Sequence, residues 1–133
     1  MSMNNKLRFI VIDDDPLNNT ICRLTIKKAL GEVDVVTFTD PHEGFEYVGT
    51  SFNGGNDHSP AVLFLDINMP IMNGWEFLER YENLEHHVKE HIRLFIVSSS
   101  VDSKDVERAS INKNVIKYLP KPVTKEIITT LVY

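Results

Sequence analysis

The sequence Val-Leu-Phe-Leu-Asp-Ile-Asn-Met-Pro-Ile-Met-Asn-Gly, residues 62–74, decides the fold of this chain. Its first four residues are apolar, which is typical of a short strand buried on both faces of a parallel sheet. The strand ends in a single carboxylate, Asp66, and Asn73-Gly74 opens a helix. The stretch therefore predicts an acid at the carboxyl end of a buried strand, where open α/β sheets bind their ligands.

A similar arrangement occurs near the amino terminus. Residues 7–12 form a largely apolar strand that ends in three acids, Asp13, Asp14 and Asp15. Pro16 suits the first position of a helix, so Asp15 is the expected N-cap, and Asp13 and Asp14 remain at the strand end. Two adjacent buried acids repel each other, which is tolerable if a cation lies between them and Asp66.

Strands and helices alternate along the rest of the chain. The strands are predicted at residues 7–12, 34–38, 62–65, 94–97 and 115–119. The helices are predicted at 17–30, 41–48, 74–88 and 103–111 and after Thr124, with a loop at 49–60. Residues 84–91 lengthen the third helix or its exit loop. This alternation predicts a parallel sheet with helices on both faces.

Two local features complete this prediction. The first helix carries two apolar stripes, and we expect this broad apolar face to cover the sheet. The stripes are Leu17-Ile21-Leu24 and Cys22-Ile26-Ala29. No glycine precedes the fifth strand, so Asn112 and Asn114 are expected to supply the left-handed turn that glycine usually makes.

Length and composition restrict the function. A chain of 133 residues suits one domain, expected at residues 7–133 after a flexible tail at 1–6. The net charge of −5 argues against a nucleic-acid partner. A single cysteine, Cys22, excludes a disulfide within the chain and fits a reducing compartment, so we expect a cytoplasmic location. No apolar run is long enough to cross a membrane.

Strand ends of a parallel sheet lie at one edge, and this edge collects polar groups. They are Asp13, Asp14, Asp66, Ser98 and Lys121. Three carboxylates and a backbone carbonyl near Asn68 make an oxygen-only ligand set, which suits Mg²⁺. A lysine, a hydroxyl and a metal ion together stabilise a transferring phosphoryl group, and a carboxylate can be its nucleophile.

The chain resembles a response regulator receiver domain of two-component signalling over residues 7–132. The motifs that carry the resemblance are Ile-Asp-Asp-Asp-Pro, Leu-Asp-Ile-Asn-Met-Pro-Ile-Met-Asn-Gly, Val-Ser-Ser and Tyr-Leu-Pro-Lys-Pro. The resemblance implies a doubly wound, flavodoxin-like α/β fold with five parallel strands in the order 2-1-3-4-5.

The resemblance also implies roles for individual residues. Asp66 would be the phosphoacceptor, Asp14 a direct Mg²⁺ ligand, Asp13 a direct or water-mediated ligand, and Asn68 a ligand through its backbone carbonyl. Lys121 would pair with the phosphoryl group, next to a cis bond to Pro122. Ser98 would donate a hydrogen bond to a phosphoryl oxygen, and Tyr118 would be the aromatic residue that turns inward as Ser98 moves.

The resemblance implies a sensor histidine kinase or phosphotransfer protein as phosphodonor, and a downstream protein whose identity stays open. Phosphorylation would bias a docking surface on the fourth helix, fifth strand and last helix. No turnover of a separate substrate is expected. Ser99 departs from the family, which has a smaller residue there.

Two alternatives stay open. One is a phosphatase resembling the haloacid dehalogenases, with Asp13 as nucleophile and Asp15 as general acid. The other is a degenerate receiver that binds partners without being phosphorylated.

Overall fold

The structure is a computed structural model and describes residues 7–51, 60–100 and 102–132. The described residues form five strands: β1 (Arg8–Ile12), β2 (Asp34–Phe38), β3 (Ala61–Asp66), β4 (Ile92–Ser98) and β5 (Val115–Pro120). They also form six helices: α1 (Pro16–Leu30), α2 (Pro41–Ser51), α3 (Gly74–Glu82), α4 (His86–Lys89), α5 (Ser103–Ser110) and α6 (Lys125–Val132). The expected tail at 1–6 and most of the expected loop lie outside these residues.

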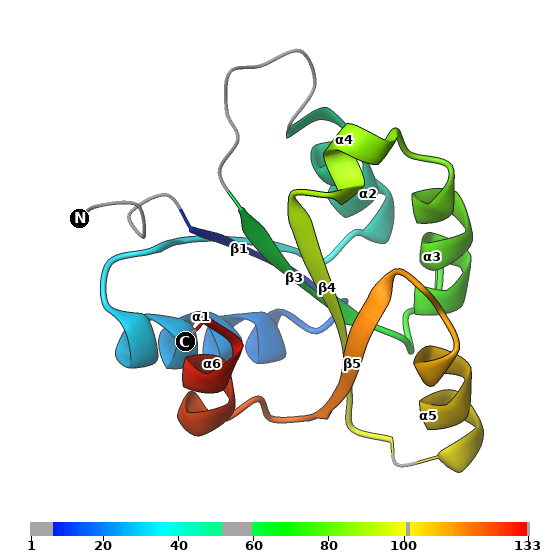
Figure 1. Ribbon diagram of the computed structural model, residues 1–133. Helices are drawn as coiled ribbons and strands as arrows, with labels where there is room; N and C mark the ends of the chain where they lie inside the picture. Colours follow the sequence, from blue (N-terminus) through cyan, green and yellow to red (C-terminus); the bar gives the residue numbers. More distant parts are fainter. Residues whose placement is uncertain (1–6, 52–59, 101, 133) are drawn as a thin grey trace.

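The five strands form one parallel sheet in the order β2-β1-β3-β4-β5, which confirms the expected doubly wound topology. Helices α1 and α6 cover one face, and α2 to α5 lie on the other (Figure 1). The central strand β3 is buried at every position, as its apolar sequence predicts. Both hydrophobic cores therefore share β3, and its carboxyl end lies in the middle of one sheet edge.

Register brings the strand ends together. Ile12 pairs with both Phe38 and Leu65, so Asp13 and Asp66 are each the next residue after the last pair between β1 and β3. Asp66 itself pairs with Val97 of β4. Ser98 pairs with Pro120, and its carbonyl accepts a hydrogen bond of 3.0 Å from the amide of Lys121. The polar groups predicted from the sequence consequently share one edge of the sheet.

Helix termini follow the capping chemistry of the sequence. Asp15 caps α1, accepting a hydrogen bond from the amide of Leu17. Asn73 and Glu76 form a reciprocal capping box at α3. Gly31 ends α1 with a φ of 80°, a conformation that favours glycine.

Three expectations about the helices are wrong. The third helix does not continue to residue 88: α3 ends at Glu82, and α4 is a separate short helix. Helix α2 reaches Ser51, so residues 49–51 are helical rather than loop. The stripe of Leu17, Ile21 and Leu24 does not cover the sheet, because these side chains are 65%, 43% and 61% exposed.

The expected left-handed turn before β5 is also wrong. No described residue other than glycine has a positive φ. Instead, the side chain of Asn112 accepts a hydrogen bond of 2.9 Å from the amide of Asn114. A side-chain turn of this kind satisfies the backbone without a left-handed residue.

None of the helices in the described part of the chain is both long and apolar enough to cross a bilayer.

Candidate functional site

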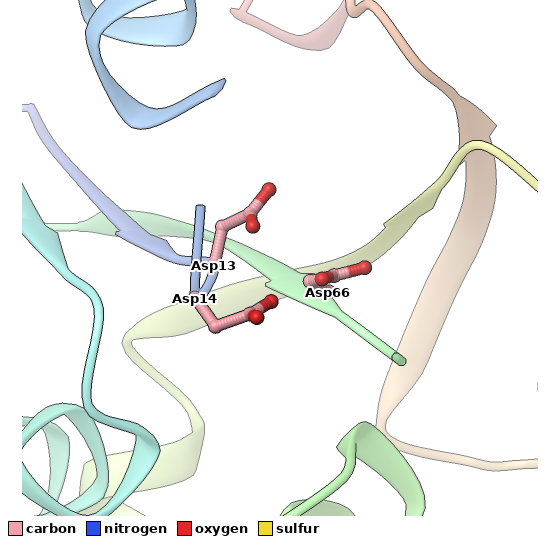
Figure 2. A group of neighbouring side chains, drawn as sticks. All are labelled: Asp13, Asp14 and Asp66. Carbon is pink, nitrogen blue, oxygen red and sulfur yellow. The ribbon is translucent and has the colours of Figure 1, made fainter. Parts of the chain in front are cut away.

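Three carboxylates meet at the carboxyl edge of the sheet. One ligand atom from each of Asp13, Asp14 and Asp66 lies within 4.8 Å of the others, and Figure 2 shows Asp14 extending toward Asp66. Asp13 and Asp66 are buried, each 5% exposed, whereas Asp14 is exposed. Carboxylates this close repel one another, so the cluster favours an added cation.

The first of the three consecutive acids is held firmly. One carboxylate oxygen of Asp13 accepts a hydrogen bond of 2.9 Å from the amide of Asp15, and the other lies 2.7 Å from Nζ of Lys121. Asp15 itself faces the helix as its cap. Asp15 is therefore the N-cap of α1, as predicted, while Asp13 and Asp14 lie at the end of β1 near Asp66.

Lys121 joins the two buried acids. Its Nζ lies 2.7 Å from Asp13 and 3.5 Å from Asp66. Burial alone would lower the pKa of Lys121, but the hydrogen bond to Asp13 and the charge of Asp66 together raise it. The bond from Lys121 to Pro122 is cis, as the resemblance implies.

Asp66 is a buried carboxyl group with a raised pKa. Burial raises its pKa to about 6, the charge of Lys121 opposes the increase, and the charge of Asp13 adds to it. The amide of Asn68 lies 3.4 Å from the carboxylate of Asp66. At neutral pH the group is mostly ionised and able to act as a ligand or nucleophile.

The chain that enters α3 passes very close to the backbone at the end of β3, which explains why residue 74 is a glycine. The amide of Gly74 donates to the carbonyl of Ile67 at 2.8 Å. A Cβ at Gly74 would lie 2.7 Å from the carbonyl oxygen of Asp66 and 2.8 Å from Cα of Ile67. Any larger residue would displace the backbone that carries Asp66.

Ser98 and Tyr118 are linked through Ser100. The hydroxyl of Ser98, which is buried, accepts a hydrogen bond of 3.0 Å from the amide of Ser100. The hydroxyl of Tyr118 donates to the carbonyl of Ser100 at 2.8 Å. The hydroxyl of Ser100 accepts from the amide of Asp102, the N-cap of α5, at 3.2 Å. The sequence pattern did not indicate this central position of Ser100.

A cavity of about 380 Å³ adjoins the acids. Its polar wall includes Asp13, Asp66, Lys121 and Ser99, and its apolar wall includes Cys22 on α1. Burial raises the pKa of the Cys22 thiol to about 12, so the thiol stays protonated at neutral pH. Cys22 also packs against the buried core, as its place in the second apolar stripe of the helix predicts.

The structure also reveals a site residue that the sequence pattern did not indicate. Asn19 on α1 is 4% exposed, and its side-chain amide donates to the carbonyl of Asp13. An asparagine near the start of a helix is usually predicted to be solvated or to cap the helix. The sequence pattern therefore does not predict this contact.

The donor set fits Mg²⁺ rather than a softer metal. Every side-chain ligand in the cluster is a carboxylate oxygen, and neither a thiol nor an imidazole belongs to it. Asn68 is exposed just beyond Asp66, where its carbonyl could complete the set. Hard oxygen ligands that leave room for water are typical of magnesium sites.

Comparisons with known proteins identify the family of the chain. The family model for the response regulator receiver domain matches residues 9–133. A response regulator receiver protein from Dyadobacter fermentans is 32% identical, with a TM-score of 0.85 over 95% of this chain and 94% of its own. A two-component response regulator from Cytophaga hutchinsonii is 25% identical, also with a TM-score of 0.85, over 95% of this chain and 93% of its own.

Curated relatives are longer proteins. The sensor histidine kinase CheAY of Helicobacter pylori is 30% identical over 98% of this chain, but the chain spans 15% of that protein. It spans 28% of the cyclic di-GMP phosphodiesterase response regulator RpfG of Xanthomonas campestris, at 29% identity. Since the family model covers nearly all of this sequence, the chain belongs to the response regulator receiver domain family of two-component signalling.

Proposed function

We propose that this domain, residues 7–133, receives a phosphoryl group on Asp66. The observation that carries the proposal is the contact of Lys121 with both Asp13 and Asp66, 2.7 and 3.5 Å away, beside the cluster of three carboxylates. A nucleophilic carboxylate, a fixed cation and a hard-metal ligand set are the groups that phosphoryl transfer requires.

Asp66 is the proposed nucleophile. One of its carboxylate oxygens bonds to the phosphorus of a phosphohistidine as the phosphorus–nitrogen bond breaks, and the imidazole leaves with its electron pair. Lys121 holds a phosphoryl oxygen by a charge-assisted hydrogen bond. Attack of water on the phosphorus later breaks the phosphorus–oxygen bond to Asp66, which releases inorganic phosphate and restores the carboxylate.

Asp13, Asp14, Asp66 and the carbonyl of Asn68 would hold Mg²⁺. When bound, the ion supplies positive charge that offsets the charge of the phosphoryl oxygens. The residues themselves orient the phosphoryl group. Asp13 stays fixed by Asp15 and Lys121, and the hydroxyl of Ser98 would donate a hydrogen bond to a phosphoryl oxygen other than the one that Lys121 holds.

Movement of Ser98 is the proposed start of the switch. Its hydroxyl now accepts from the amide of Ser100 at 3.0 Å, and Ser100 contacts both Tyr118 and Asp102. A shift of Ser98 toward the phosphoryl group would therefore act on β5 and on the N-terminus of α5. We propose α5, β5 and α6 as the surface that a downstream protein reads.

A sensor histidine kinase or phosphotransfer protein is the proposed phosphodonor, and the chain turns over no separate substrate. A cytoplasmic location belongs to the same proposal and rests on the single cysteine. The phosphatase alternative is disfavoured because Asp15, its required general acid, caps α1 instead.

Intact-mass spectrometry after incubation with Mg²⁺ and acetyl phosphate tests the proposal. The wild type should gain the mass of one phosphoryl group, and the gain should vanish in Asp66→Asn and with chelator. Asp34→Asn is the matched control, because Asp34 is exposed at the amino end of β2, whereas the acids of the site lie at the carboxyl ends of the strands.

Two results would contradict the proposal. An adduct that survives Asp66→Asn but is lost in Asp13→Asn would favour the phosphatase reading. A wild type that gains no mass with acetyl phosphate or with a phosphorylated histidine protein would favour the degenerate receiver.

A further inference from the structure

Asn19 occupies an unusual position for its chemistry. It lies in the first turns of α1, where asparagine is a poor helix former, and it is 4% exposed. A buried polar side chain is stable only where it forms hydrogen bonds. The bonds that Asn19 forms therefore indicate what it does.

Its side-chain amide bridges the ends of two strands. Nδ2 donates to the carbonyl of Asp13 at 3.0 Å and to the carbonyl of Phe38 at 3.3 Å. The last paired residues of β1 and β2 are Ile12 and Phe38, and the amide of Asp13 continues the ladder to Phe38. Asn19 thus holds the backbone one residue beyond the last strand pair, in the turn formed by Asp13, Asp14 and Asp15, which we call the acidic turn.

The held carbonyl belongs to the peptide that joins Asp13 to Asp14. A peptide unit is planar, so fixing its oxygen fixes the plane from which Asp14 starts. Among the described residues, the carboxylate of Asp14 has no hydrogen bond or ion pair of its own, in contrast to Asp13. The position of Asp14 consequently depends on its backbone.

We propose that Asn19 is a positioning residue that preorganises Asp13 and Asp14 for a divalent cation. The inference rests on the proposed function, because it takes these acids as metal ligands. The side-chain hydrogen bonds of Asn19 go to the carbonyls of Asp13 and Phe38, so the proposed effect on the cation passes through the backbone of Asp13 and Asp14.

The side-chain oxygen of Asn19 suggests which substitution to use as a test. The side-chain oxygen of Asn19 is buried without a hydrogen-bond partner among the described residues. Asn19→Leu keeps the branched shape, removes the donor and also removes this unsatisfied acceptor. The carbonyls of Asp13 and Phe38 lose this donor, so some stability should be lost as well. The Mg²⁺ midpoint is therefore the deciding readout, because destabilisation elsewhere in the fold would not move it.

The experiment is a Mg²⁺ titration of the ¹⁵N-labelled protein, followed by amide chemical shifts. Asn19→Leu should raise the half-saturating Mg²⁺ concentration about tenfold, the lower end of the range for groups that orient metal ligands. At saturating Mg²⁺ the phosphorylation rate should return to that of the wild type. Val88→Ala is the control: Val88 is buried on α4, away from the acids, and its truncation should lower stability without changing the Mg²⁺ midpoint.

The outcomes separate the inference from the function on which it rests. A wild type that neither binds Mg²⁺ nor gains a phosphoryl group overturns both. A wild type that binds, with Asn19→Leu within twofold of it or matched by Val88→Ala, overturns the role of Asn19 alone. If Asn19→Leu does not fold, Asn19→Ser carries the same test, because its hydroxyl is too short to bridge both carbonyls.

Discussion

Asp66 is a buried carboxyl group whose ionisation costs the folded protein free energy. Burial raises its pKa from 3.8 to about 6. Between these values the folded state binds more protons than the unfolded state, so stability falls as the pH rises, and the full cost is present above about pH 6.

Asp66→Asn should therefore stabilise the metal-free protein. In chelator at pH 8 we expect a gain of about 1–2 kcal/mol in the free energy of unfolding, after allowance for solvent screening. The gain should shrink as the pH falls through about 6 and vanish below the unfolded value of 3.8. Urea unfolding at several pH values measures it; a gain that does not depend on pH would contradict this explanation.

Lys121→Met should have the opposite effect. It leaves Asp13 and Asp66 without their shared cation, so we expect a loss of about 2–3 kcal/mol at pH 8 in chelator. The loss should be smaller at pH 5, where Asp66 is mostly protonated. Lys117→Met, which removes an exposed lysine from the adjacent strand β5, is the control and should change stability by less than about 0.5 kcal/mol. Equal losses in the two variants would argue against the ion pairs.

Single residues differ in how far the sequence predicts them. Asp13, Asp66 and Lys121 could be placed together because each follows a strand, and register then brings strand ends into contact. Asn19 could not be predicted, because its partners are backbone carbonyls of other elements, which leave no mark on the sequence. Asn112 formed a side-chain turn where a left-handed residue was expected.

At the scale of the element, α1 shows what periodicity leaves open. Its sequence has two apolar stripes, and both suit burial equally well. Only the stripe that contains Ile26 packs against the sheet: Ile26 is fully buried, while Leu24 in the other stripe is 61% exposed. Similarly, the stripe from Phe77 to Val88 is buried at both ends, yet the backbone breaks between α3 and α4.

The two stripes of α1 should respond differently to truncation. Ile26→Ala removes fully buried methyl groups, so we expect a loss of about 2–5 kcal/mol in the free energy of unfolding. Leu24→Ala, two residues away on the same helix, should change it by less than about 0.5 kcal/mol. Denaturant unfolding of both variants compares them directly. A comparable loss in Leu24→Ala would mean that the outer stripe is covered in solution.

At the scale of the molecule, alternation of strands and helices sufficed to predict the sheet, and the resemblance supplied the strand order. The same sheet explains why carboxylates crowd together and repel one another at the site. The ends of β1 and β3 bring ligand atoms of three carboxylates to within 4.8 Å of one another. Among the described residues, the ion pairs of Lys121 join it to Asp13 and Asp66 and not to Asp14. Asp14 is the acid left for the metal ion to neutralise.

Mg²⁺ should consequently stabilise the whole domain, and Asp14 should carry the effect. A ligand that binds only the folded state at ten times its dissociation constant adds about 1.4 kcal/mol, which raises Tm by roughly 3–6 °C in a domain of this size. Asp14→Asn should abolish this shift and leave the Tm in chelator equal or slightly higher, because one repelling charge is gone. Thermal unfolding at matched ionic strength measures both effects, and Asp34→Asn should keep the full shift. An undiminished shift in Asp14→Asn would place the ion away from the acidic turn, since Asp13 and Asp66 are already neutralised in part by Lys121.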